Sequence, residues 1–100
     1  MKIPKTVKVL GRVYKVIRDN SLADDKMCWG YFDSREDIIV LRERDYKLTP
    51  GRERQVFLHE LIHVLDDSLQ IKLSEKQVQL LAVGLTCLIE ENELDFRDGK

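Results

Sequence analysis

The chain of 100 residues contains little of what marks secreted or membrane-spanning proteins. Two cysteines, Cys28 and Cys87, are too few for the disulfide framework of a small secreted domain, so we expect both to be reduced and buried. No stretch approaches the roughly 18 apolar residues of a membrane span. Charges at Lys2, Lys5 and Lys8 interrupt the segment in which a signal peptide would be apolar. These absences predict a cytoplasmic protein with no membrane partner.

Neither sign of charge is in excess. The chain has 17 lysines and arginines against 18 aspartates and glutamates, and the formal net charge is −1. The arginines between positions 42 and 54 alternate with Glu43, Asp45 and Glu53, which is typical of a solvated surface of mixed charge. Nucleic acid and anionic membrane are therefore not expected as the main partners, and a small DNA-binding regulator is disfavoured.

The first half of the chain has the alternation of apolar and polar residues that is typical of β-strands. Residues 6–10 and 12–18 form two such runs, separated by one glycine. Residues 27–32 and 37–42 bracket a polar tetrapeptide and are predicted to form a β-hairpin. Its second strand contains four consecutive apolar residues, Ile38 to Leu41, which predict burial on both faces for part of that strand.

The second half is predicted to be helical. Thr49 is a suitable N-cap and Pro50 a suitable first helical residue, so a buried central helix is expected from about Pro50 to Ser68. A second helix is expected from the Ser74–Gln77 capping box to about Glu91. Gly84 is tolerable within it and would allow close approach of the two helices. The predicted core residues of this helix are Val78, Leu81, Ala82, Leu85, Leu88 and Ile89.

These elements predict one α+β domain over residues 1–100. We expect a small antiparallel or mixed sheet of three to four strands that packs against the central helix and a second, C-terminal helix. Residues 5–92 would form the core of this domain, and residues 93–100 would be a frayed tail.

The chain's only two histidines form the motif H-E-x-x-H, from His59 to His63. On a helix, these two imidazoles lie on one face about 6 Å apart along the axis and can bind one Zn²⁺ at about 2.0–2.1 Å. Glu60 lies about 100° round the helix, where it can act as the base towards a metal-bound water. The alternative is that the three side chains merely decorate a helix, but their burial without partners would be costly.

A catalytic zinc usually has a third protein ligand and one open position. Asp66 is unsuitable because three ligands in line along one helix cannot surround a tetrahedral ion, and Asp66 or Asp67 is better suited to accept an imidazole N–H. Glu75 follows a short connector and would return to the histidines if the helices pack antiparallel. Spacing alone leaves Asp67, Glu90 and Glu91 open as alternatives, although Glu90 and Glu91 would lie some 22 Å from Glu75.

Residues 59–63 on one helix, and Glu75-Lys76-Gln77-Val78 at the start of the next, resemble the minimal gluzincin-type metallopeptidases of phages and mobile genetic elements, including the ImmA/IrrE-like group. The resemblance covers roughly residues 27–91. It implies one zinc per chain, with Glu75 as the third ligand, and a protein substrate inside the cell, such as a regulator or repressor. Such peptidases often use a Tyr, His or Arg to stabilise the oxyanion. Tyr46 is our candidate for this role, and Tyr14 and Tyr31 are expected to be core or strand residues.

The expected function is zinc-dependent hydrolysis of peptide bonds, with Glu60 as the catalytic base. An extended peptide could pair with a free sheet edge, for which the strand Ile38 to Leu41 is the first choice. The alternative is a catalytically weak or inactive zinc-binding module that docks a protein partner by the same edge. Glu60 favours the enzyme, because a structural zinc site has no use for a base beside the metal. The oligomeric state stays open.

Overall fold

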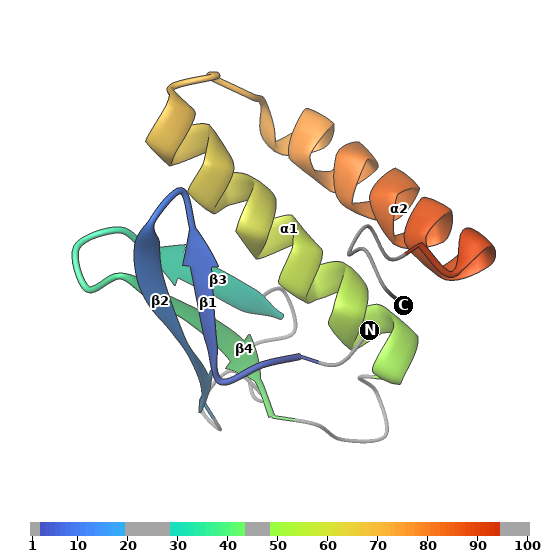
Figure 1. The fold of residues 1–100 in the computed structure, drawn as a ribbon, viewed down its shortest axis with the longest axis horizontal. Coiled ribbons are helices and arrows are strands. Elements are labelled where there is room, and N and C mark those ends of the chain that lie inside the picture. The colour runs from blue at the N-terminus through green and yellow to red at the C-terminus, as the bar shows by residue number, and fades with distance from the viewer. Residues whose placement is uncertain (1–2, 20–28, 44–48, 95–100) are drawn as a thin grey trace.

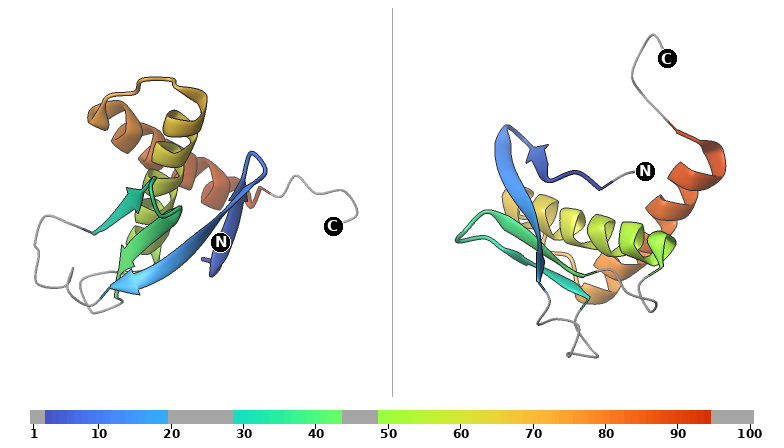
Figure 2. Two further views of the ribbon diagram at one scale, coloured as in Figure 1. Left: turned by 90° about the vertical axis from the view of Figure 1, so that its left-hand side faces the viewer. Right: turned by 90° about the horizontal axis from the view of Figure 1, so that it is seen from below.

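The computed structural model describes residues 3–19, 29–43 and 49–94, and it confirms the predicted α+β fold with a mixed four-stranded sheet and two helices. Helix α1 covers one face of the sheet, and α2 lies on the far side of α1 (Figures 1 and 2). The strands are β1 (Thr6–Val9), β2 (Arg12–Asp19), β3 (Gly30–Asp33) and β4 (Ile38–Arg42). The helices are α1 (Pro50–Leu69) and α2 (Glu75–Asn92).

The sheet has the order β1-β2-β4-β3. β1 and β2 form an antiparallel hairpin, and both residues of its turn, Leu10 and Gly11, have positive φ, at 51° and 85°. Two such residues match the twist of a tight hairpin, and glycine adopts this conformation without strain. β4 is parallel to β2 and antiparallel to β3, so the sheet is mixed.

The prediction that Ile38 to Leu41 forms a free edge is wrong. β4 lies inside the sheet, where Val40 is paired with Ile17 of β2 on one side and with Tyr31 of β3 on the other. Ile39, Val40 and Leu41 are 0%, 0% and 1% exposed, so the predicted burial on both faces is confirmed. A run of apolar residues needs cover on both faces, which an interior strand provides more readily than an edge strand. The outer strands of the sheet are β1 and β3.

Helix α1 presents a single buried stripe to the sheet. Thr49 caps the helix as predicted, because its side chain accepts a hydrogen bond from the backbone N–H of Arg52. Glu53, Phe57, Glu60 and Val64 follow at the spacing of one helix face, and all four are buried. Phe57 and Val64 belong to the main apolar core, together with Tyr14, Ile39 and Leu41. This packing determines the rotation of α1 about its axis.

A partly buried ion pair anchors the N-terminal turns of α1 to the sheet. Glu53 is 1% exposed, and its carboxylate lies 2.7 Å from the guanidinium of Arg18 on β2. Arg18 also donates a hydrogen bond to the backbone carbonyl of Arg42, at 3.2 Å. Because a buried carboxylate without a partner would be costly, this pair makes the Glu53 position compatible with the core.

Helix α2 begins with the predicted capping box between Ser74 and Gln77, in which both hydrogen bonds are formed. Val78 and Ala82 pack with Ile62 of α1 in a second, smaller apolar cluster. The first turn of α2 is therefore tightly defined by its own cap and by α1.

The predicted core stripe of α2 is too wide. Leu81, Leu85 and Leu88 are 45%, 40% and 54% exposed, because a helix that packs mainly on one other helix buries a narrow stripe. The predictions for Gly84 and Cys87 are also wrong. Apart from its chain neighbours and its own helix backbone, no atom lies within 4 Å of the place that a Cβ on Gly84 would occupy, so this glycine does not bring the helices together. Cys87 is exposed rather than buried, and Cys28 lies outside the described residues.

Helix α2 ends at Asn92, one residue beyond the predicted end, and Glu93 terminates it in the left-handed conformation. Residues 95–100 of the predicted tail lie outside the described residues. Neither described helix combines the length and the apolar character that crossing a membrane requires.

Gly30 allows β3 to approach its neighbours closely. A Cβ at this position would lie 2.8 Å from the carbonyl oxygen of Val40 and 3.1 Å from Cγ1 of Val56 on α1. Both distances are shorter than an ordinary van der Waals contact, so any larger residue would push β3 away from β4 and α1.

We therefore expect Gly30→Ala to lower the free energy of unfolding by about 1–3 kcal/mol, the usual cost of overpacking a core. Urea denaturation followed by circular dichroism measures this change. Gly84→Ala is the matched control, because its methyl group meets open space within a helix and should stabilise the protein by about 0.5–1 kcal/mol. Equal responses of the two variants would contradict this account of β3.

Candidate metal centre

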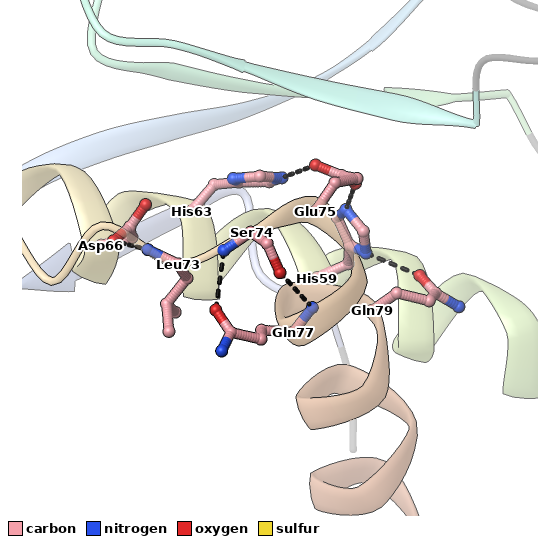
Figure 3. A network of polar contacts seen from close by, with 8 residues as sticks. All are labelled: His59, His63, Asp66, Leu73, Ser74, Glu75, Gln77 and Gln79. Atoms are coloured by element: carbon pink, nitrogen blue, oxygen red, sulfur yellow. Dashed lines mark hydrogen bonds and ion pairs between the residues drawn. The ribbon is translucent and has the colours of Figure 1, made fainter.

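The structure brings the three predicted metal ligands together from two helices. Nε2 of His59 lies 2.7 Å from one carboxylate oxygen of Glu75, and Nε2 of His63 lies 3.1 Å from the other. The ligand atoms of the three residues all lie within 4.8 Å of one another (Figure 3). The two imidazole rings are 4.9 Å apart between centroids and inclined by 62°. Each side chain thus directs a donor atom towards a shared point.

A short connector returns the chain so that Glu75 meets the histidines. Gln70 ends α1 in the left-handed conformation, and Lys72 is also left-handed, with φ of 54° and 68°. Asp66 fastens this turn, because its carboxylate accepts a hydrogen bond from the backbone N–H of Leu73, at 3.0 Å. The sequence predicted that Asp66 or Asp67 would accept an imidazole N–H. The imidazole of His59 contacts Gln79 instead, and the carboxylate of Asp66 shapes the connector.

The imidazole of His59 has a different partner, Gln79, which the sequence reasoning missed. Nδ1 of His59 lies 2.8 Å from the side-chain oxygen of Gln79 on α2 (Figure 3). An amide oxygen can only accept, so this contact favours the ring proton on Nδ1. Nε2, which contacts Glu75 in this structure, is then the nitrogen that would bind a metal. The available signal was spacing, because Gln79 follows Glu75 by four residues and shares its helix face.

The alternative third ligands lie elsewhere. Glu90 pairs with Arg54, and the hydrogen bond from that guanidinium holds the pKa of Glu90 below its usual range. Neither Asp67 nor Glu91 brings a carboxylate oxygen into the group of mutually close ligand atoms. Within residues 3–19, 29–43 and 49–94, His59, His63 and Glu75 are the one group of three potential ligands in mutual reach.

The structure describes two of the three tyrosines, Tyr14 and Tyr31. Tyr14 is buried in the core, edge-on to Phe32, as expected for a strand residue of the sheet. Tyr31 lies on β3, as expected, and its side chain is exposed. Tyr46, the predicted oxyanion-stabilising residue, lies outside the described residues.

Glu60 is buried beside the ligand cluster and is 5% exposed. Burial raises its pKa to about 7, while the nearby His59 lowers it and the nearby Glu75 raises it. Glu53 lies two turns earlier in the same stripe but is neutralised by Arg18, whereas no lysine or arginine of the described residues pairs with Glu60. A carboxyl with a pKa near neutrality is suited to accept a proton and to return it.

Two cavities flank the ligand cluster, and His59, Glu60 and Glu75 line both. One has a volume of about 260 Å³ and extends towards Trp29 and the N-terminal turns of α1. The other has a volume of about 500 Å³ and extends along β3 towards the C-terminal turns of α1. The cluster therefore lies in the middle of an open cleft between β3 and the two helices.

No family model, no curated protein and no solved structure matches this chain. Its function therefore has to be inferred from its own residues. Those residues are two imidazoles and a carboxylate in mutual reach, a buried glutamate beside them, and the cleft onto which all four open.

Proposed function

We propose that this protein is a zinc-dependent peptidase that hydrolyses peptide bonds of a protein substrate. The observation that carries the proposal is the cluster of His59, His63 and Glu75, with donor atoms within 4.8 Å of one another, beside the buried carboxyl of Glu60. Two histidines and a glutamate are a known donor set for catalytic zinc, which keeps its fourth position open. The open cleft around the cluster supports a site that admits a substrate.

The donor atoms fit zinc in kind as well as in position. Imidazole nitrogen suits Zn²⁺, and the contact of His59 Nδ1 with Gln79 favours the tautomer in which Nε2 would bind a metal. When bound, zinc supplies Lewis-acid chemistry, since it polarises a carbonyl oxygen and lowers the pKa of water towards 7.

Glu60 would carry the proton transfers of the reaction. Its carboxylate takes a proton from the attacking water as the bond from oxygen to the scissile carbonyl carbon forms. It then returns that proton to the nitrogen of the leaving amine as the C–N bond breaks. Glu60 is 5% exposed and lines both cavities, so this buried carboxyl borders the cleft.

β3 replaces β4 as the strand that would bind an extended substrate. It is an outer strand of the sheet, it passes beside the ligand cluster in Figure 3, and Gly30 lines both cavities together with His59. The backbone groups on its open side could pair with a peptide by β-augmentation. As the family resemblance implies, we propose a protein substrate in the cytoplasm, such as a regulator.

The first prediction of this proposal is one zinc per chain, which His63→Ala should abolish. Elemental analysis after dialysis measures the stoichiometry. Glu91→Ala is the matched control, because it removes an exposed carboxylate from the same helix as Glu75 and should leave the zinc content unchanged. Full retention of zinc by His63→Ala would refute the site.

A second prediction concerns Gln79. Gln79→Ala removes the acceptor that orients His59, so zinc affinity should fall by about 10–100-fold, the usual effect of losing an outer partner of a ligand. Gln79→Glu keeps an acceptor at the same place and should lose less. Competition with a chelating dye measures both affinities. If Gln79→Ala binds zinc as tightly as the parent, the contact does not orient the ligand.

The third prediction separates chemistry from metal binding. Glu60→Gln keeps the size and polarity of the side chain but cannot accept the proton, so peptide hydrolysis should slow by about 10²–10⁴-fold. Zinc content and circular dichroism should not change, because Glu60 is not among the three ligands. Undiminished cleavage by Glu60→Gln would show that another group is the base.

A further inference from the structure

The smaller cavity connects the ligand cluster to an arginine. It has a volume of about 260 Å³ and runs beside α1 from His59 and Glu60 to Trp29 and Arg52. Arg52 precedes His59 by seven residues, which is about 10 Å along the helix axis. An extended peptide spans this distance in about three residues. Arg52 is therefore within reach of a substrate side chain close to the cleaved bond.

Trp29 holds the guanidinium of Arg52 at the end of this cavity. The guanidinium carbon lies 5.0 Å from the centroid of the indole ring, within the range of a cation–π contact. The buried Arg42 fixes Trp29 in turn, since its backbone N–H donates to the carbonyl of Trp29 at 2.9 Å and its guanidinium lies 4.6 Å from the ring. Stacking on an aromatic ring leaves the N–H groups at the edge of a guanidinium available to an anion.

The side chain of Arg52 has no carboxylate partner among the described residues, whereas Arg18 is paired with Glu53 and Arg54 with Glu90. An ion pair within the protein would compete with any anionic ligand. Arg52 is exposed and keeps its charge available. Its position is thus that of a binding group rather than of a structural one.

The charges around the cleft differ at its two ends. Glu60 and Glu75 face the shared middle, and a divalent ion bound there would cancel their two negative charges. The end towards the start of α1 then carries the positive charge of Arg52, and the opposite end carries Asp66 and Asp67. An acidic side chain is favoured at the first end and disfavoured at the second.

We infer that the cavity between Trp29 and the ligand cluster is a carboxylate-binding subsite, in which Arg52 selects an aspartate or glutamate of the substrate. The selected residue lies within about three positions of the cleaved bond, on one side of that bond. This inference rests on the proposed peptidase function and names its substrate class, a protein segment with an acidic residue beside the cleavage site. Arg52 is the specificity-determining residue.

The test uses the zinc-loaded full chain and a set of internally quenched peptides. In each peptide, a single position on one side of the cleaved bond is varied to Asp, Ala or Lys. The parent should show a kcat/KM about tenfold higher for Asp than for Lys at one position, as a charge-assisted hydrogen bond in a partly enclosed site allows. Arg52→Gln should remove this preference, and Arg52→Glu should reverse it. High salt should weaken it.

The matched control is Arg12→Gln, which removes an exposed arginine from the β1–β2 hairpin. Arg12 lines neither cavity of the cleft, so this variant should keep the preference. The Arg52 variants should fold, because the hydrogen bond to Thr49 uses the backbone of residue 52 and not its side chain. Circular dichroism and zinc content check this. A preference that survives in Arg52→Glu, or its absence from the parent, would overturn the inference and leave the peptidase function standing.

A second readout does not depend on turnover. Fluorescence anisotropy with the Glu60→Gln variant compares binding of labelled peptides that differ only in Asp or Lys. Tighter binding of the acidic peptide supports the subsite if this difference is lost when Arg52→Gln is added. This support holds even if the parent cleaves no peptide, a result with which the peptidase proposal alone would fail. Equal binding of the two peptides would refute the subsite itself.

Discussion

The rotation of α1 about its own axis determines where His59, Glu60 and His63 point. Phe57 and Val64 bury against the sheet, and Ile62 buries against α2, so the helix has no freedom to turn. Because successive residues are about 100° apart, the two histidines then face the gap between the sheet and α2. Core packing thus holds the two histidines in place, and any change that turned this helix would separate His59 and His63 from Glu75.

The same stripe of α1 contains two buried glutamates, whose surroundings differ. Arg18 neutralises the charge of Glu53, and this ion pair links α1 to β2. Glu60 lacks such a partner among the described residues, and its pKa is raised to about 7 by burial. An apolar residue at position 60 would suit the core better, and a position that breaks the local packing rule in this way is typical of a functional site.

The helices could be predicted because their caps depend on residues close together in the sequence. The order of the strands depends on pairing between distant residues and could not be predicted. Thr49 and Ser74 form their caps with residues three positions away, so the sequence contains both partners. The apolar run at Ile38 predicted burial correctly, and the local pattern predicted the hairpin of β3 with β4. The parallel pairing of β4 with β2 joins parts of the chain that are distant in sequence, and no local pattern specifies it. Similarly, its place after a short connector made Glu75 the stronger candidate, although spacing left alternatives open. The contact of Gln79 with His59 depends on how closely the two helices approach.

The narrow contact between α1 and α2 has a consequence for the dynamics of the chain. Val78 and Ala82 contribute a small buried area, so α2 depends on few apolar contacts for its attachment. A zinc ion bound between the histidines of α1 and Glu75 of α2 would cross-link the two helices next to their connector. Occupancy of the site would then govern the opening rate of α2, and amide hydrogen exchange along this helix would report whether the metal is present.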